Sequence, residues 1–167
     1  MENDEEKVCS SINEIIDTYS EMVYRVILQH MHNEADAKDV LQDVCIKLMK
    51  AIPVFETRQK EKAWILRVAI NTCKDHWKYD RLRKHDDLLD NYIAPQEKQE
   101  DFEILPYVLR LSQKYRDVIY LFYYEEYSVK EISEILEKKE ATILTWLRRA
   151  RMKLKDVLEG SDWHAEI

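Results

Sequence analysis

SVKEISEIL, residues 128–136, is followed by the polar turn EKKE, residues 137–140, and then by ATILTWLRRARMKL, residues 141–154. Ser128 and Glu131 have the spacing of a capping box, in which each side chain bonds to the backbone N–H of the other residue, so a helix is expected to begin there. Thr142 is expected to help begin the next helix. Its apolar side consists of Ile143, Leu147, Ala150, Leu154 and Leu158, which recur at helical spacing.

The other side of this second helix is basic, with Arg148, Arg149, Arg151, Lys153 and Lys155. A short helix, a tight turn and a longer helix with a basic face are typical of a helix-turn-helix, whose second helix enters the DNA major groove. A helical hairpin with a solvated charged face is the simpler alternative for this stretch alone.

The composition favours an all-α fold. The 167 residues include one glycine and three prolines, so tight β-hairpins and glycine-rich phosphate loops are nearly excluded. The net charge of −7 is unusual for a protein that binds nucleic acid, but the charges are segregated. Residues 60–85 hold eight cations and three acids, and residues 139–155 hold six cations and one acid. Residues 86–103 between them hold seven acids and one cation.

This charge pattern divides the chain into two small helical domains, 8–86 and 102–160, joined by an acidic linker at 87–101. In the first domain we expect helices over about 11–32, from Asn33 or Asp36 to Pro53, and from about Glu61 into the eighties, with a loop over 54–59. The inward set of the second helix is Ala37, Val40, Leu41, Val44, Leu48 and Met49, and that of the third is Leu66, Ala69, Ile70, Cys73 and Trp77.

The second domain is expected to contain two further helices before the helix-turn-helix, over 102–111 and 114–125. Tyr115, Val118, Ile119, Leu121 and Phe122 of the latter should face inward and support the helix-turn-helix.

Several classes of protein are disfavoured. Three widely spaced cysteines suggest neither a disulfide framework nor a zinc site, and no signal peptide or membrane span is recognisable, so a cytoplasmic protein is expected. His30 and His32 point to different sides of a helix, and Cys73 with His76 lacks a second pair, so no metal or other cofactor is expected. No nucleophile, base and orienting group form a recognisable set, so the chain is not expected to be an enzyme or to bind a small-molecule substrate.

Several segments resemble the extracytoplasmic-function (ECF) sigma factors of bacterial RNA polymerase. Residues 36–44, DAKDVLQDV, are similar to the family pattern D-A-E-D-hydrophobic-x-Q-E-V, and residues 63–75, AWILRVAINTCKD, to its W-L-x-x-I-A-x-N-x-x-x-D run. Residues 111–119, 131–133 and 148–154 resemble its C-terminal domain, so the resemblance runs from about residue 12 to 158. Leu144 and Trp146 stand where the family often has lysine and arginine.

The resemblance implies a two-domain factor that binds core RNA polymerase, recognises promoter DNA and initiates transcription of a stress- or signal-responsive set of genes. It further implies an anti-sigma partner, often membrane-anchored in this family. The polymerase-binding residues would be Asp36, Asp39, Gln42 and Asp43. The downstream promoter element would be contacted by Phe55, Arg58, Lys60, Asn71, Asp75, Lys78 and Arg81, and the upstream element by Thr142, Thr145, Arg148, Arg149 and Arg151.

Three tryptophans keep more than one interpretation. Trp64 and Trp77 are expected in the core rather than stacked on a base, and Trp146 is expected to pack on its own domain rather than to contact a thymine methyl group. Two other functions remain open: a stand-alone helix-turn-helix regulator, which leaves the basic block 60–85 without a role, and a helical module that binds another protein through residues 36–43.

Overall fold

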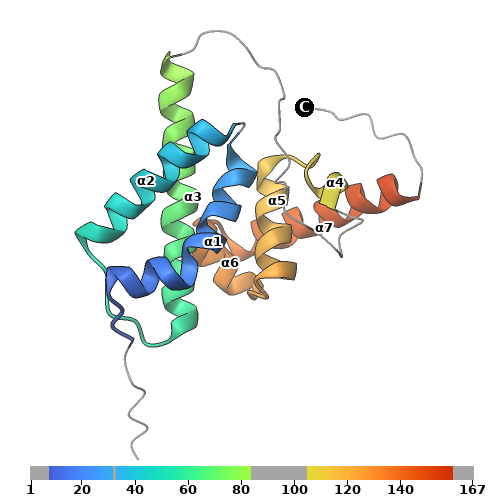
Figure 1. Cartoon of the computed structure of the whole chain (residues 1–167). Coiled ribbons are helices and arrows are strands. Elements are labelled where there is room, and N and C mark those ends of the chain that lie inside the picture. Colours follow the sequence, from blue (N-terminus) through green and yellow to red (C-terminus); the bar gives the residue numbers. More distant parts are fainter. Residues whose placement is uncertain (1–7, 32, 84–104, 160–167) are drawn as a thin grey trace, which may run out of the picture. The chain divides into compact units, whose positions relative to one another are not determined.

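The computed structural model describes residues 8–31, 33–83 and 105–159, without the side chains of residues 81–83 and 105. These residues form seven α-helices and one π-helix, with one isolated β-bridge between Val8 and Phe55, so the predicted all-α fold is confirmed (Figure 1). The chain divides into two compact units between Pro95 and Gln96. The predicted linker, 87–101, lies outside the described residues. No helix in the described part is long and apolar enough to cross a membrane.

The N-terminal unit is a three-helix bundle of α1 (Ile12–His30), α2 (Glu34–Lys50) and α3 (Arg58–Arg83), each of which contacts the other two (Figure 1). Ser11 and Glu14 form a capping box that begins α1, and the Asn33 side chain accepts a hydrogen bond from the Asp36 N–H to begin α2. The core side chains are Ile15, Tyr19, Val23, Ile27, Met31, Ala37, Val40, Val44, Leu48, Ile65, Ala69 and Cys73. Their spacing on each helix follows the helical repeat, which explains the closed apolar interior.

Three predictions for this unit need correction. Met49 was expected to face inward, but it is 68% exposed, because it lies at helical spacing from Gln42 and Ile46 on the exposed side of α2 and not on the buried stripe that ends at Leu48. Residues 58 and 59 were expected in the loop, but α3 begins at Arg58, where the Thr57 hydroxyl accepts a hydrogen bond from the Lys60 N–H. α1 ends at His30, and His32 lies outside the described residues.

The C-terminal unit contains α4 (Leu105–Val108), α5 (Gln113–Ile119), the π-helix η1 (Tyr120–Tyr124), α6 (Val129–Leu136) and α7 (Glu140–Leu158). α5 and α6 both contact α7, so α7 is the central helix of this unit (Figure 1). The predicted Ser128–Glu131 capping box is present, and the short helix, turn and long helix occur as expected. The buried side chains of α6 and α7 are Ile132, Ile135, Leu136, Ile143, Leu147, Ala150 and Leu154.

The turn between α6 and α7 lacks glycine, and Glu137 takes the left-handed conformation at φ 55°. The Lys138 N–H donates to the Ser133 carbonyl oxygen at 3.0 Å and the Glu137 N–H donates to the same oxygen, so α6 ends in a Schellman-type motif. A non-glycine residue adopts this conformation only at a cost in free energy. The turn is therefore formed at the expense of some stability.

The C-terminal unit also departs from the sequence predictions. α7 begins at Glu140 with Lys139 as its cap, so Thr142, which was expected to help begin the helix, lies in its first turn and does not cap it. Leu158 is 56% exposed because it lies in the last turn, beyond the packed part of α7. The helix expected over 114–125 changes at Tyr120 to a π-helix, where the Glu125 N–H donates to the Tyr120 carbonyl oxygen, and Phe122 is only partly buried. α4 ends at Val108, before the predicted end at residue 111, and residues 102–104 of the expected helix lie outside the described part.

Candidate functional site

The polar face of α2 is exposed. Asp39, Gln42 and Asp43 are all solvent-exposed, and none of them makes a hydrogen bond or ion pair with another described residue. They lie three and four residues apart, so they share one side of the helix. Two unpaired carboxylates and an amide on one helical face form a surface that can receive a complementary partner.

Asp36 differs from these three residues. It is half-buried, and its carboxylate accepts a hydrogen bond from the Asn33 side-chain amide at 2.6 Å. The nearest Asp36 oxygen lies 4.0 Å from Nε2 of His76 on α3. The structure therefore gives Asp36 contacts that organise the beginning of α2, in addition to its place beside the exposed face.

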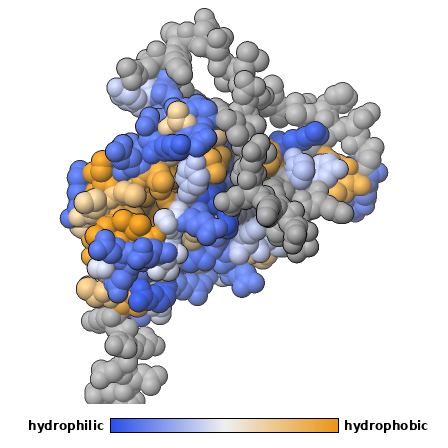
Figure 2. Space-filling view, viewed as in Figure 1, coloured by the Kyte–Doolittle hydropathy of each residue, from blue (hydrophilic) through white to orange (hydrophobic). Residues whose placement is uncertain are grey.

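Apolar side chains continue the polar face of α2. Ile46 is 46% exposed and Met49 is 68% exposed, and both follow Asp39, Gln42 and Asp43 at helical spacing. Figure 2 shows apolar surface on the side of the N-terminal unit where α1 and α2 lie. Sequence analysis assigned Met49 to the core and left Ile46 unassigned, although both lie at helical spacing from the exposed residue Gln42.

One group of side chains in the described part has metal-ligand chemistry. Asp36, His76 and Asp80 each offer one atom, and these atoms lie within 4.8 Å of one another. His76 Nε2 is 3.6 Å from the Asp80 carboxylate, one helical turn along α3. The His76 ring therefore lies between a carboxylate of α2, Asp36, and a carboxylate of its own helix α3, Asp80.

The loop before α3 is fixed from two sides. The backbone of Phe55 exchanges two hydrogen bonds with Val8, of 2.7 and 2.9 Å, and the Phe55 ring lies 5.5 Å from the Trp64 ring. Phe55 is therefore half-buried rather than projecting into solvent. Lys60 is exposed and pairs with Glu56 one turn earlier.

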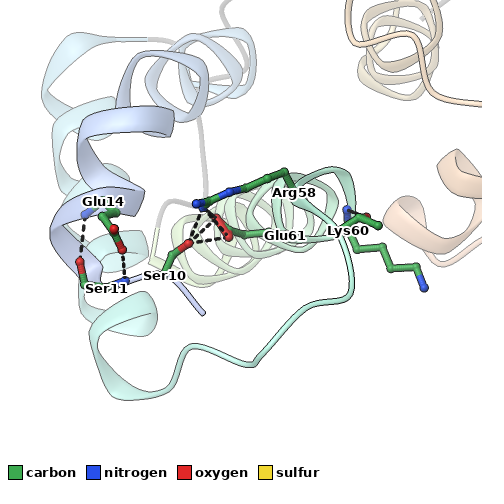
Figure 3. Close-up of polar contacts among 7 residues, drawn as sticks. Ser10, Ser11, Glu14, Arg58, Lys60 and Glu61 are labelled. Atoms are coloured by element: carbon green, nitrogen blue, oxygen red, sulfur yellow. Dashed lines mark hydrogen bonds and ion pairs between the residues drawn. The ribbon is translucent and has the colours of Figure 1, made fainter. Parts of the chain in front are cut away.

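Arg58 takes part in a network at the beginning of α3, which Figure 3 shows. Its Nη1 donates to the Ser10 hydroxyl at 2.6 Å and to both oxygens of Glu61 at 3.3 Å. The Ser10 hydroxyl in turn donates to Glu61 at 2.8 Å, although the two residues are 51 positions apart. Glu61 is fully buried, whereas the Arg58 side chain is 64% exposed.

The exposed side of α3 carries the remaining residues predicted for the downstream promoter. Asn71 is half-buried, Lys78 is exposed, and Asp75 pairs with Lys47 of α2 at 3.4 Å. Arg81 lies in the last turns of α3, and its side chain is outside the described part. Arg67 and Lys74 share this side at spacings of four and three residues from Asn71, so they extend its positive charge. Sequence analysis placed both in the basic block but did not choose them as site residues.

The tryptophans of the N-terminal unit pack as expected. Trp64 and Trp77 are partly buried against the core cluster, and the Trp77 ring N–H donates to the His30 carbonyl oxygen at 2.8 Å. Neither indole is therefore exposed as a stacking platform.

The basic face of α7 is open. Arg148 and Arg149 are exposed and have no partner among the described residues. Arg151 is also exposed, but its guanidinium lies 5.6 Å from the Phe122 ring centre and 5.9 Å from that of Tyr123. The π-helix therefore holds Arg151 by cation–π contacts, while its two neighbours remain available to an anion.

The first turns of α7 combine polar and apolar residues. Thr142 and Thr145 are half-buried, and the Thr145 hydroxyl donates to the Ala141 carbonyl oxygen at 2.9 Å. Leu144 is 56% exposed. Trp146 is half-buried, with the Lys114 ammonium 5.9 Å from its ring centre, which agrees with the expected packing on its own domain.

The chain matches two family models in the order of its two units. Sigma-70 region 2 matches residues 15–84, and Sigma-70 region 4 matches residues 102–154. Among relatives from Bacillus subtilis, the ECF RNA polymerase sigma factor SigW is 29% identical over 87% of each chain. The ECF sigma factor SigM from the same organism is 31% identical over 87% of this chain and 93% of its own.

Solved structures show the same fold. Sigma factor RpoE of Bartonella quintana, determined with anti-sigma factor NepR, has a TM-score of 0.63 at 16% identity and covers 90% of this chain and 98% of its own. CnrH, determined with the cytosolic domain of CnrY, has a TM-score of 0.59 at 18% identity and covers 90% and 89%. Given both family models and the extent of the match to SigM, this chain belongs to the ECF sigma factors of RNA polymerase.

Proposed function

We propose that the chain docks on core RNA polymerase through α2, with Asp36, Asp39, Gln42 and Asp43 as the polar part of the contact. The observation that carries this proposal is that Asp39, Gln42 and Asp43 are exposed and unpaired within the described residues. Ile46 and Met49 add apolar area beside them. A polar face next to exposed apolar side chains is the composition of many protein–protein interfaces, in which the apolar part supplies most of the binding free energy.

The downstream promoter element would be bound by the loop before α3 and by the exposed side of α3. Arg58, Lys60 and Lys78 carry positive charge there, and Asn71 offers both a donor and an acceptor to a base edge. Phe55 contributes through the shape of the loop, since its ring already packs on Trp64. Asp75 would orient Lys47 of α2, and Arg81 would extend the contact along the helix.

The upstream element would be read by α7. Arg148 and Arg149 would bind phosphates, Arg151 would do so from its position against Phe122 and Tyr123, and Thr142 and Thr145 lie on the first turns that enter the groove. The proposed domains are 8–86 for polymerase and downstream-element binding and 102–160 for the upstream element, with 87–101 between them. The chain would thus act as a DNA-binding regulator in the cytoplasm rather than as an enzyme.

An anti-sigma factor is a further proposed partner. RpoE of Bartonella quintana was determined with the anti-sigma factor NepR, and CnrH with the cytosolic domain of CnrY. A regulator of this kind would control the present chain by covering surfaces that polymerase needs.

The proposal is tested by selecting duplexes from a randomised DNA library with the chain alone and with the chain bound to sigma-free core polymerase. We expect only the mixture with core polymerase to select a promoter and to start transcription from it. Selection of a palindromic duplex by the chain alone, with no transcription on adding core polymerase, would instead favour a stand-alone helix-turn-helix regulator.

A further inference from the structure

Arg58 is held by Ser10, from the segment before α1, and by Glu61, one turn further along α3. Ser10 precedes α1, Tyr19 lies on α1, and Glu61 lies on α3 together with Arg58. The Glu61 carboxylate accepts hydrogen bonds from the Ser10 hydroxyl, the Arg58 guanidinium and the Tyr19 phenol. Burial, and then the nearby Glu61 carboxylate, raise the pKa of Tyr19, so this phenol stays protonated and can donate.

The Ser10 hydroxyl links the other members of this network. A hydroxyl has one hydrogen to donate and lone pairs to accept, and here it accepts from Arg58 Nη1 while it donates to Glu61. Only Nη1 of Arg58 is used in this way. The remaining guanidinium nitrogens make no hydrogen bond with described residues, and the side chain is 64% exposed. The Nε–Nη2 edge is therefore free to bind a phosphate or a base with two parallel hydrogen bonds.

The residues just before Ser10 hold the same loop at a second point. Val8 and Phe55 exchange two backbone hydrogen bonds, so residues 8–10 contact both the middle of the loop and the beginning of α3. Figure 3 shows the chain of contacts from Ser10 to Arg58 and Glu61. Because a free arginine side chain samples many rotamers, fixing its position before DNA arrives reduces the entropy lost on binding.

We propose that Ser10 and Glu61 are positioning residues for promoter recognition, which hold Arg58 so that its free edge contacts the opened DNA of the downstream element. This rests on the proposed function, in which the loop before α3 binds that element. Ser10 itself lies outside the segment that sequence analysis assigned to DNA. Its role would be exerted through Arg58.

The test is a double-mutant cycle in the holoenzyme assembled from the full chain and core polymerase. The probe is a fluorescent fork-junction DNA that carries the selected downstream element as a single strand, and its affinity is measured by anisotropy. Ser10→Ala removes both hydrogen bonds of the hydroxyl and is expected to weaken binding about three- to tenfold. Ser10→Thr keeps the hydroxyl and should restore most of the affinity.

The same Ser10→Ala change should have no further effect in an Arg58→Ala background, since the arginine that it positions is gone. Ser20→Ala, at an exposed position of α1, is the matched control and should bind as the unsubstituted chain does. Glu61→Gln, which keeps the shape but removes the charge, should weaken binding through Arg58 in the same way.

Three results would overturn the inference. If Arg58→Ala weakens DNA binding while Ser10→Ala and Glu61→Gln do not, the arginine acts without being positioned, and the proposed function stands. If Ser10→Ala lowers the affinity for DNA as much in the Arg58→Ala background as in the unsubstituted chain, Ser10 has only a structural role. If Arg58→Ala does not change the affinity for DNA, Arg58 does not contact the downstream element, and the inference is wrong. Polymerase binding is measured in a separate experiment and is not affected by this result.

Discussion

Asp39 shows how a single exposed charge can be assigned a role. It has no partner among the described residues, so its solvated carboxylate adds nothing specific to the fold. A charge of this kind is free to determine the rate and strength of association with a complementary surface. Asp36, one turn earlier, is instead engaged by Asn33 and faces His76.

Asp39→Arg should therefore weaken binding to core polymerase by about tenfold or more, because it replaces an attractive charge by a repulsive one. The melting temperature should hardly change. Binding is measured by titrating labelled chain with core polymerase. Asp17→Arg, an equivalent change at an exposed and unpaired position of α1, is the control. Equal affinities for the two variants would remove α2 as the docking surface.

Glu14 gives a prediction about pH. The Ser11 backbone N–H donates to its carboxylate at 2.6 Å, and this bond, followed by that to the Ser11 side chain, lowers the pKa of Glu14 from its ordinary value of 4.5. Since the folded pKa is the lower one, the ionised carboxylate stabilises the fold above pH 4.5 and loses this effect as the pH falls through the folded pKa. Glu14→Gln should thus be less stable than the unsubstituted chain at pH 7.

The difference in unfolding free energy between these two chains should shrink as the pH falls below 4.5, and urea unfolding at a series of pH values measures it. Asp17→Asn, which removes a carboxylate from an exposed and unpaired position of α1, is the control and should show no such pH dependence. A difference that stays constant from pH 7 downwards would show that the Glu14 carboxylate is not bonded to the cap.

The backbone conformation at the end of α6 lowers the stability of the C-terminal unit. Glu137 occupies a left-handed position that glycine takes without steric cost. Glu137→Gly should raise the stability of the C-terminal unit by about 1 kcal/mol, which is seen as a melting temperature higher by roughly 4–8 °C.

Glu134→Gly is the matched control, because Glu134 is exposed within α6, where glycine should instead cost about 1 kcal/mol. If both substitutions destabilise the unit to the same extent, the left-handed conformation of Glu137 is not a source of strain.

The basic face of α7 should make promoter binding depend on ionic strength. Arg148→Ala and Arg149→Ala should each weaken promoter binding and lower the slope of log affinity against log salt by about one, as expected when one phosphate contact is lost. Arg25→Ala, which removes an arginine of α1 that pairs with Glu21, is the control and should leave the slope unchanged. Slopes that remain equal in all three variants would mean that the basic face of α7 does not meet phosphates.

The two units show what can be predicted from sequence. The helices and most of the core followed from apolar residues three and four positions apart, and the Ser128 cap followed from a spacing of three, because these signals are local. The π-helix at Tyr120–Tyr124 leaves no periodic signal in the sequence, and Met49 was placed inward although helical spacing puts it on the exposed side of α2 with Gln42 and Ile46.

Some features of the candidate site could be predicted from sequence and others could not. The exposed faces of α2 and α7 follow from helical spacing, and the resemblance to the family assigned roles to Asp39 and Arg148 on those faces. The hydrogen bond between Ser10 and Glu61 joins residues 51 positions apart and produces no pattern in the chain. The positioning of Arg58 became visible only once the three-dimensional contacts were known.

Gel filtration of the purified chain with sigma-free core RNA polymerase at moderate salt tests the account as a whole most directly. We expect the chain to elute with the polymerase, and the Asp39→Arg variant to elute separately while it keeps its melting temperature. A well-folded chain that never elutes with core polymerase would contradict the account.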